Sequence, residues 1–279
     1  MSLSTRFRRA RSNLMERFGS AFLGIEALLV YLFLYIPVFI LVALSFNDSR
    51  YAIVWQGFTT EWYAAMLRGE TIGRVDPSVA WTALQHSLEI AVVTVVVSVV
   101  IGTMLALALD QYDFPGKQLF QGVVYMPLVI PSIVMGISLL IFFNTVGMNQ
   151  GIGTAIIGHV AFDISYVTVI VLARLQSFDR TMEEAAMDLG ASELETFRWV
   201  TFPLIKPGII AGALLGFALS FDDFVVTFFI IGNETTLPIF FFSMVRQGIS
   251  PGVNVVATVI LVITLSLILL AQKIEGITW

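Results

Sequence analysis

The chain has 279 residues, of which 57% are hydrophobic and 13% are charged, and its mean hydropathy is +0.89. These values exclude an ordinary water-soluble domain and indicate a polytopic membrane protein. The net charge of −5 says little about partners, because in a membrane protein the side that each charge occupies matters more than the sum, and no nucleic-acid partner is predicted. The lack of cysteine and the wide separation of the two histidines, His86 and His159, argue against disulfides and a metal site.

Apolar runs of about 20 residues, the length that a helix needs to cross a bilayer, recur along the chain. We predict six spans, at 21–45, 87–109, 119–143, 155–175, 206–231 and 254–272. The first run is too long for a cleavable signal peptide, so we expect it to be retained. The predicted fold class is therefore an all-α membrane protein.

The Lys and Arg residues are distributed unequally between the loops. With the N-terminus inside, eleven of the 15 fall in inside segments and four in outside segments. Because basic loops stay in the cytoplasm, both termini are predicted to be cytoplasmic, in a multi-pass protein of the inner (cytoplasmic) cell membrane. The parts are then a basic N-terminus (1–20), the first span (21–45), an external loop (46–85), a transmembrane domain of five spans (84–272) and a cytoplasmic tail (273–279).

Two predicted external segments have a character of their own. Thr60 is placed to cap a short amphipathic helix carrying Trp62, Tyr63 and Met66, which suits an interfacial aromatic belt or, alternatively, a docking surface. The segment 232–254 is too apolar for a free loop and too interrupted by proline and glycine to span. A re-entrant or surface-lying segment is predicted there.

The third predicted span contains Pro127 and Pro131. Each proline removes a backbone hydrogen bond, so the helix should kink or open at this point. Kinks of this kind are common in transmembrane helices, and a gating role is only one interpretation.

Several nucleotide-binding and catalytic motifs are missing from the sequence. It contains no complete P-loop, no G-x-S-x-G and no H-E-x-x-H. We therefore expect it neither to bind ATP through a P-loop nor to be an enzyme, and we predict no catalytic residue.

The most charged stretch, 183–204, lies between the fourth and fifth predicted spans. Gly190 sits where a short helix must stop, and Pro203 is expected to end a second one. Two capping boxes mark the starts of these helices: Thr181 with Glu184, and Ser192 with Glu195. The pattern predicts a helix, a glycine turn and a helix within the loop 176–205, on the cytoplasmic face.

This loop resembles a known motif. Glu184-Ala185-Ala186, followed by Gly190 and by Val200-Thr201-Phe202-Pro203, is similar to the EAA motif of permease subunits of type I ABC importers, with Phe202 in place of the usual leucine. The stretches "SFNDS", "VWQGFTTEWYAAML", "SFDDFVVTFF" and "LPIFFFSMVRQGISPGVNVVAT" resemble the subgroup that serves spermidine and putrescine importers. The resemblance thus covers most of the chain.

The resemblance implies an assembly. The loop would be a coupling helix that docks on a dimer of ATPase subunits, which would hold the ATP and magnesium, with no cofactor in this chain. A second, homologous permease in a heterodimer, an external binding protein and membrane lipid would be the other partners. The solute would be a polyamine, with ferric iron, thiamine or an opine as alternatives. Residues assigned to ATPase coupling are Glu183, Glu184, Ala185, Ala186, Asp188, Gly190, Ser192 and Pro203.

Ionisable residues inside predicted spans suggest a solute path. Asp222 and Asp223 lie deep in the fifth span, about 100 degrees apart on a helix. Ser220, Asp223 and Thr227 share one face, which we expect to line a wet pathway. Asp222 is expected nearer a helix contact or a cation of a partner.

The fourth span adds an i,i+4 pair, His159 and Asp163, with Tyr166 on the same face. These residues either line the pathway or form hydrogen bonds between helices, and Asp163 could pair with His159. Carboxylates interleaved with Phe221 and Phe224 would favour a polyammonium solute through charge pairing and cation–π contact.

A different class of function stays open at this point. An ion-coupled secondary transporter would use the three aspartates as proton or cation sites, but it would be expected to contain an internal repeat, and none is visible.

Overall fold

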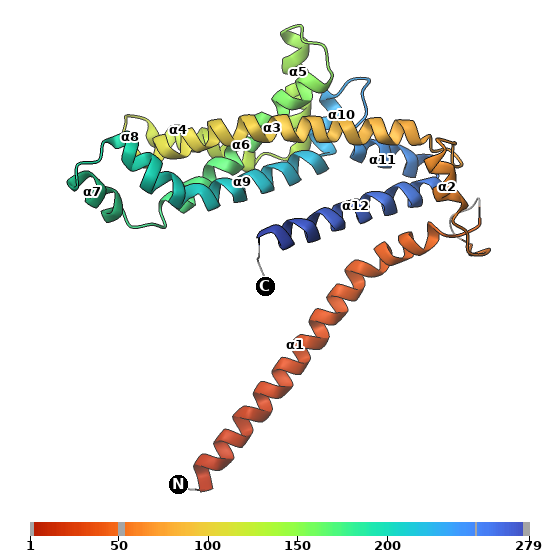
Figure 1. Cartoon of the computed structure of the whole chain (residues 1–279), viewed down its shortest axis with the longest axis horizontal. Helices are drawn as coiled ribbons and strands as arrows, with labels where there is room; N and C mark the ends of the chain where they lie inside the picture. The colour runs from red at the N-terminus through yellow and green to blue at the C-terminus, as the bar shows by residue number, and fades with distance from the viewer. Residues whose placement is uncertain (1–2, 50–53, 249, 276–279) are drawn as a thin grey trace. The chain divides into compact units, whose positions relative to one another are not determined.

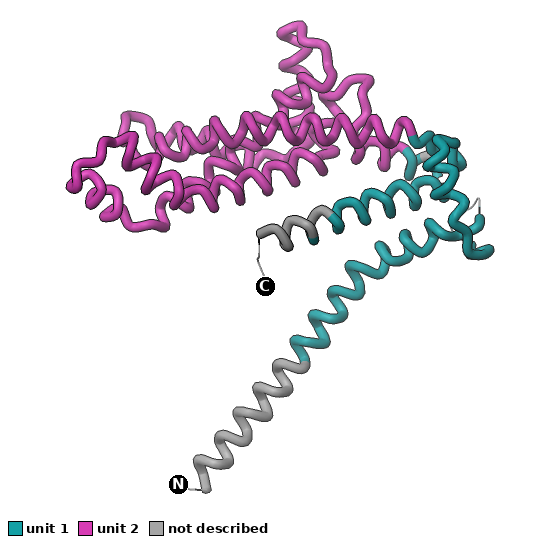
Figure 2. Tube along the Cα trace, viewed as in Figure 1, with its two compact units in different colours: residues 1–77, 244–279 teal, residues 78–243 magenta. Residues whose placement is uncertain are grey.

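The computed structural model describes residues 3–49, 54–248 and 250–275, and the regular secondary structure in these is helical apart from two isolated β-bridges. Arg50 and the tail residues 276–279, which carry part of the orientation and domain predictions, lie outside the described residues. The chain divides into one compact unit of residues 1–77 and 244–279 and another of residues 78–243 (Figure 2).

Among the described residues, four helical segments are long and apolar enough to cross a membrane, and a bent pair would make a fifth. The four are Phe22–Leu44 in α1 (Leu3–Leu44), α3 (Pro77–Gln111), α6 (Ile152–Leu175) and Glu193–Asp222. The predicted sixth span lies on α12 (Pro251–Glu275), whose described apolar stretch is Pro251–Ser266, and several later side chains of this helix lie outside the described residues. The prediction of six spans is therefore supported only as four or five apolar helices among the described residues.

In the first unit, α2 (Glu61–Leu67) forms where the sequence predicts a short helix. Its side chains Trp62, Tyr63 and Met66 pack around the buried residues of a small cluster that includes Ile72. The expected cap is wrong in detail, because the Thr60 side chain makes no capping bond and Thr59 Oγ1 accepts from Glu61 N at 3.1 Å instead.

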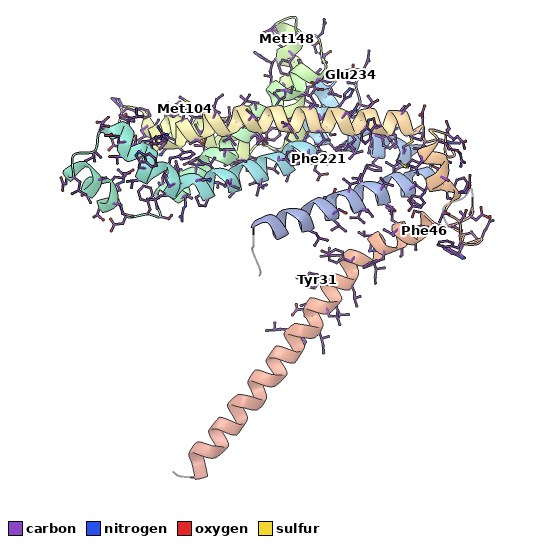
Figure 3. The ribbon with its side chains drawn as sticks, viewed as in Figure 1. Tyr31, Phe46, Met104, Met148, Phe221 and Glu234 are labelled. Carbon is purple, nitrogen blue, oxygen red and sulfur yellow. The ribbon has the colours of Figure 1, made fainter. Side chains whose placement is uncertain are left out.

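The apolar part of α1 presents its side chains outward. None of the 23 residues from Phe22 to Leu44 is buried, and Tyr31 projects from the helix (Figure 3). A helix that is apolar and unburied in this way suits a lipid environment.

In the second unit, α3 runs along α6 and α9 (Phe202–Asp222) (Figure 1). Gly208, Gly212 and Gly216 form a stripe on α9 that faces α6, where side chains built on them would meet Arg174, Val167 and Asp163 respectively. Small residues at a spacing of four let two helix backbones approach closely, as in membrane helix pairs.

The predicted third span is broken. It consists of α4 (Lys117–Tyr125), the 3-10 turn η1 (Met126–Leu128) and α5 (Ser132–Thr145), and the two arms are bent by 104°. Pro131 is extended at the break, with ψ 133°. The predicted kink or opening at the prolines is confirmed.

The predicted fifth span, 206–231, is not one helix either, which corrects the sequence prediction. The α9 helix ends at Asp222, Asp223 is extended with ψ 119°, and α10 (Val225–Ile230) follows. Oδ2 of Asp223 accepts from the backbone N of Thr227 at 2.7 Å, so the carboxylate caps α10 in place of continuing the helix. Beyond it, the segment 232–254 holds the short helix α11 (Leu237–Gln247).

Candidate functional site

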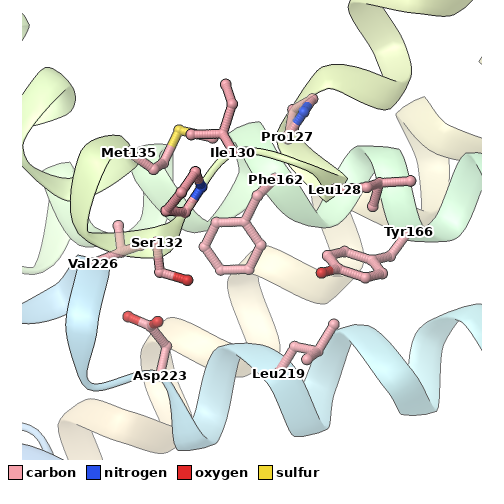
Figure 4. Close-up of a pocket in the computed structure, with 11 residues that line it drawn as sticks. Pro127, Leu128, Ile130, Ser132, Met135, Phe162, Tyr166, Leu219, Asp223 and Val226 are labelled. Atoms are coloured by element: carbon pink, nitrogen blue, oxygen red, sulfur yellow. The ribbon is translucent and has the colours of Figure 1, made fainter.

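A cavity of about 240 Å³ lies where the two helix breaks meet in the second unit (Figure 4). One wall comes from the proline segment between α4 and α5, and the opposite wall comes from the end of α9 and the start of α10. Its lining residues are Pro127, Leu128, Ile130, Pro131, Ser132, Met135, Phe162, Tyr166, Leu219, Asp223 and Val226. Asp223 is the charged residue among them, beside the hydroxyl of Ser132 and the rings of Phe162 and Tyr166 (Figure 4).

Asp223 belongs to a buried network of hydrogen bonds. Thr227 Oγ1 donates to Asp223 Oδ2 at 2.8 Å, beside the bond from the Thr227 backbone. His159 of α6 bonds Thr227 Oγ1 through Nε2 at 2.8 Å and Ser220 Oγ through Nδ1 at 2.7 Å. The predicted grouping of Ser220, Asp223 and Thr227 is therefore present, although the helix that was expected to carry all three is broken between them.

His159 and Asp163 do not pair as one interpretation expected. Asp163 is fully buried, and neither of its oxygens has a hydrogen-bond partner among the described residues. Its Oδ2 would be 3.4 Å from a Cβ on Gly216, which places the carboxyl between α6 and the glycine stripe of α9. His159 instead lies 3.5 Å from Asp223, measured between Nε2 and Oδ2.

The other predicted pathway residues are distributed differently. Tyr166 lines the cavity with Asp223. Asp222 is exposed on this chain, and Phe221 stacks on Phe217 with ring centroids 5.7 Å apart. Phe224 packs against Phe242 at 4.6 Å. None of Asp222, Phe221 and Phe224 is among the residues that line the cavity.

Two residues of this wall, Phe162 and Ser132, were not predicted from the sequence. Phe162 contacts the His159 ring at 5.3 Å between centroids and lines the cavity, as does Ser132 just after Pro131. The two prolines could have indicated these residues. A break in a helix leaves the neighbouring backbone and side chains free to line a cavity, whereas a continuous helix does not.

The polar loop 176–205 has the predicted helix, glycine turn and helix. The first helix is α7 (Thr181–Asp188) and the second is α8 (Glu193–Thr196), with Gly190 at φ +93° between them. A positive φ of this size suits glycine and explains why the first helix stops there.

One of the two predicted capping boxes is present. Ser192 N donates to Glu195 Oε2 at 2.9 Å, and Glu195 N donates to Ser192 Oγ at 3.4 Å. This box fixes the start of α8.

The Thr181 box is wrong. Thr181 is already inside α7, and its backbone N donates to Asp179 Oδ1 at 3.0 Å. This bond, with one from the Thr181 hydroxyl, holds the pKa of Asp179 below its usual value. Asp179 and Thr181 both carry a side-chain oxygen near the start of α7, and Asp179 is the residue that caps it.

Pro203 does not end the second helix, which corrects another expectation. The helical path continues from Glu193 to Asp222 through α8, the π-helical turn η2 (Phe197–Thr201) and α9, with Pro203 in the first turn of α9. The wider π turn accommodates a residue that cannot donate a backbone hydrogen bond.

The loop is tied to the bundle from its inner side. Arg180 bonds the Asp110 carboxylate at the end of α3 at 2.8 Å, and Glu183 accepts from the Thr201 hydroxyl. Three carboxylates of the loop were predicted to contact a partner. Glu183 is already bonded within this chain, whereas Glu184 and Asp188 are exposed.

Large apolar side chains stand beside these carboxylates. Leu189 is 90% exposed and Leu194 75% exposed. Sequence reasoning overlooked both residues, although an apolar residue next to a turn glycine in a charged loop is a signal for a covered surface.

Comparison with known proteins places the chain among transport permeases. It is 41% identical over 246 residues, 88% of this chain and 90% of the relative, to the spermidine/putrescine transport system permease protein PotC of Escherichia coli (strain K12). It is 40% identical over 242 residues, 84% of this chain and 83% of the relative, to the putrescine transport system permease protein PotI of the same strain.

Solved structures agree at the level of fold. A bacterial ABC transporter involved in the import of the acidic polysaccharide alginate matches with a TM-score of 0.66 at 18% identity over 98% of both chains. Another crystal structure of a bacterial alginate transporter, in complex with its periplasmic protein, matches with a TM-score of 0.69 at 14% identity, covering 94% of this chain and 96% of the other.

The family model of the binding-protein-dependent transport system inner membrane component matches residues 98–275, which include the cavity, His159 and the polar loop. The chain belongs to this family of membrane-embedded transport permease subunits.

Proposed function

We propose that this chain is one permease subunit of an ATP-driven importer of polyamines. The single observation that carries the choice of solute is the identity of 41% to a spermidine/putrescine permease over nearly the whole chain. The cavity supports it independently, because its charged lining residue is a carboxylate flanked by aromatic rings, a setting that suits an organic ammonium ion.

The proposed assembly follows the importer family. The chain crosses the inner membrane six times with both termini in the cytoplasm, and it pairs with a second, homologous permease. An external binding protein delivers the solute, and two ATPase subunits bind ATP and magnesium. The break in α4–α5 and the unburied apolar face of α1 are compatible with this arrangement of spans and with surrounding lipid.

The polar loop is the proposed docking element for an ATPase subunit. Its inner side is anchored to α3 and η2 by Arg180 and Glu183, so a push on α7 is transmitted to the helices. Its outer side presents Glu184 and Leu189 to a partner. Charge-assisted hydrogen bonds to the carboxylates and apolar burial of the leucine would hold the ATPase there.

The cavity is the proposed passage for the solute within this subunit. Asp223 supplies the negative charge, and the rings of Phe162 and Tyr166 supply polarisable walls. We expect Asp223→Asn to slow uptake while leaving the assembly with the ATPase intact.

The test is polyamine-dependent ATP hydrolysis in proteoliposomes that contain this chain with its co-purified partners and its binding protein. Putrescine and spermidine should stimulate hydrolysis. Gly190→Pro should reduce the stimulated rate to the basal rate, because proline cannot adopt the φ of +93° on which the turn depends. Gly190→Asn is the matched control and should stay close to the wild type, since asparagine tolerates this region.

Each outcome has a defined meaning. Hydrolysis indifferent to polyamines would overturn the solute and keep the importer. A fully active Gly190→Pro variant would remove the polar loop from the coupling path. Uptake by this chain alone, driven by an ion gradient and without an ATPase, would replace the importer by a secondary transporter.

A further inference from the structure

We propose that His159 is a positioning residue for Asp223: it bridges the break between α9 and α10 and fixes which carboxylate oxygen of Asp223 faces the cavity. The inference rests on the proposed function, because it assumes that Asp223 meets a cationic solute there. It concerns a residue that does not itself line the cavity.

The bridge spans the break at which the backbone hydrogen bonds of α9 do not continue into α10. Ser220 is in the last turn of α9 and Thr227 is in α10, with the extended Asp223 between them. His159 contacts both hydroxyls, at 2.7 Å and 2.8 Å. Its imidazole thus replaces the helical hydrogen bonds that the break removes.

The donors and acceptors of the network can be ordered from its chemistry. An ionised Asp223 only accepts, so the Thr227 hydroxyl uses its single proton on Oδ2. That hydroxyl must then accept from His159, which places a proton on Nε2. In a neutral imidazole Nδ1 is the acceptor, and it receives the hydroxyl proton of Ser220.

The order gives the network a direction, from Ser220 through His159 and Thr227 to Asp223. It ends on Oδ2, which receives two bonds from Thr227, at 2.7 Å and 2.8 Å. Within the described part of the chain, Oδ1 receives no hydrogen bond, and it is the oxygen left for a solute. Hydrogen bonds in a buried chain reinforce one another, so the orientation of Asp223 depends on the imidazole at the far end.

The burial of the network supports a fixed rather than a mobile arrangement. His159 is 1% exposed, Ser220 3% and Thr227 0%, whereas the Asp223 side chain retains 13%. Of these four residues, only Asp223 lines the cavity. The others act through it.

The experiment measures putrescine uptake and ATP hydrolysis in proteoliposomes of the complete complex over a range of loaded binding protein. His159→Leu removes both hydrogen bonds and should lower the maximal uptake per ATP about tenfold, without changing the binding-protein concentration for half-maximal rate. His159→Gln should restore most of the uptake, because its amide presents one acceptor and one donor in place of Nδ1 and Nε2. His86→Leu is the control for the loss of a histidine bond away from the cavity: it removes the bond from His86 Nδ1 to Thr235 O at 3.0 Å and should keep the maximal uptake per ATP.

A double variant separates positioning from packing. If His159 acts through Asp223, then His159→Leu should add nothing to the loss already caused by Asp223→Asn. Thr227→Val keeps the imidazole and the shape but cuts the relay, and it should lose as much uptake as His159→Leu. This variant keeps the test informative if His159→Leu fails to assemble.

Three results would overturn the inference alone: a His159→Leu variant with normal uptake, a His159→Gln variant no better than His159→Leu, or a full additional loss in the double variant. A wild-type complex that takes up no putrescine would overturn the proposed function and the inference with it.

Discussion

At the scale of single residues, Asp163 and Asp223 of the second unit contrast in how their carboxyl groups are held. Oδ2 of Asp223 is satisfied by two donors and its side chain borders the cavity. Asp163 is fully buried with no donor among the described residues. An unpaired carboxyl in such a place costs free energy in the charged form and contributes little in the neutral one.

This contrast predicts different results from the same substitution. Asp163→Asn should be at least as stable as the wild type, with a gain of up to about 1–2 kcal/mol, because a neutral amide of the same shape replaces a group whose charged form would be buried without a partner. Its uptake should stay within about twofold of the wild type, since the carboxyl does not reach the cavity. Asp223→Asn in parallel should lose uptake. The thermal midpoint of the purified complex and uptake into proteoliposomes check both.

If Asp163→Asn instead keeps its stability but loses uptake, Asp163 belongs to the solute path after all. That interpretation was open in the sequence, where the i,i+4 spacing from His159 identifies a shared helix face but not the partners on the facing helices. The structure shows that Ser220 and Thr227 come closer to the imidazole than Asp163 does.

At the scale of elements, the two helix breaks show what sequence can and cannot predict. The break at Pro131 follows from a residue that cannot donate a backbone hydrogen bond, so it is visible in the sequence. The break at Asp223 depends on a carboxylate that captures the Thr227 amide, and the surrounding residues are as apolar as a helix interior. In the polar loop, likewise, Gly190 marks the turn correctly, but the choice between Asp179 and Thr181 as the cap needs coordinates.

The glycine stripe of α9 gives a graded prediction. Gly208→Ala would place a methyl 2.8 Å from Arg174 Cβ, whereas Gly212→Ala would meet Val167 at an ordinary 3.4 Å. Gly208→Ala should therefore force α6 and α9 apart and cost about 1–3 kcal/mol, and Gly212→Ala should be tolerated. The readout is the amount of chain in membranes and its thermal midpoint.

Gly122→Ala in α4 is the control for adding a methyl to a membrane helix, since nothing lies within 4 Å of the position. Equal stabilities for Gly208→Ala and Gly212→Ala would show that α6 and α9 do not pack at the distance seen here.

At the scale of the whole molecule, the sequence predicts more than the helices alone can show. The apolar runs locate the long helices well. An apolar helix can cross the membrane or lie on it, however, and the packing between helices is the same whichever end faces the cytoplasm. The excess of basic residues on one side is the physical basis for orientation, because the membrane potential and lipid charge act on these loops during insertion. Orientation therefore has to be measured.

The chain lends itself to that measurement because it contains no cysteine, so a single introduced thiol has no background. Leu67 in α2 and Leu189 in the polar loop are 91% and 90% exposed, which makes them equally reactive positions on opposite predicted sides. In intact cells with a permeable outer layer, a membrane-impermeant maleimide should label Leu67→Cys and spare Leu189→Cys. Opening the inner membrane should then label both. Labelling of Leu189→Cys in intact cells would put the polar loop outside, out of reach of any cytoplasmic ATPase, and labelling of neither before opening would place α2 inside.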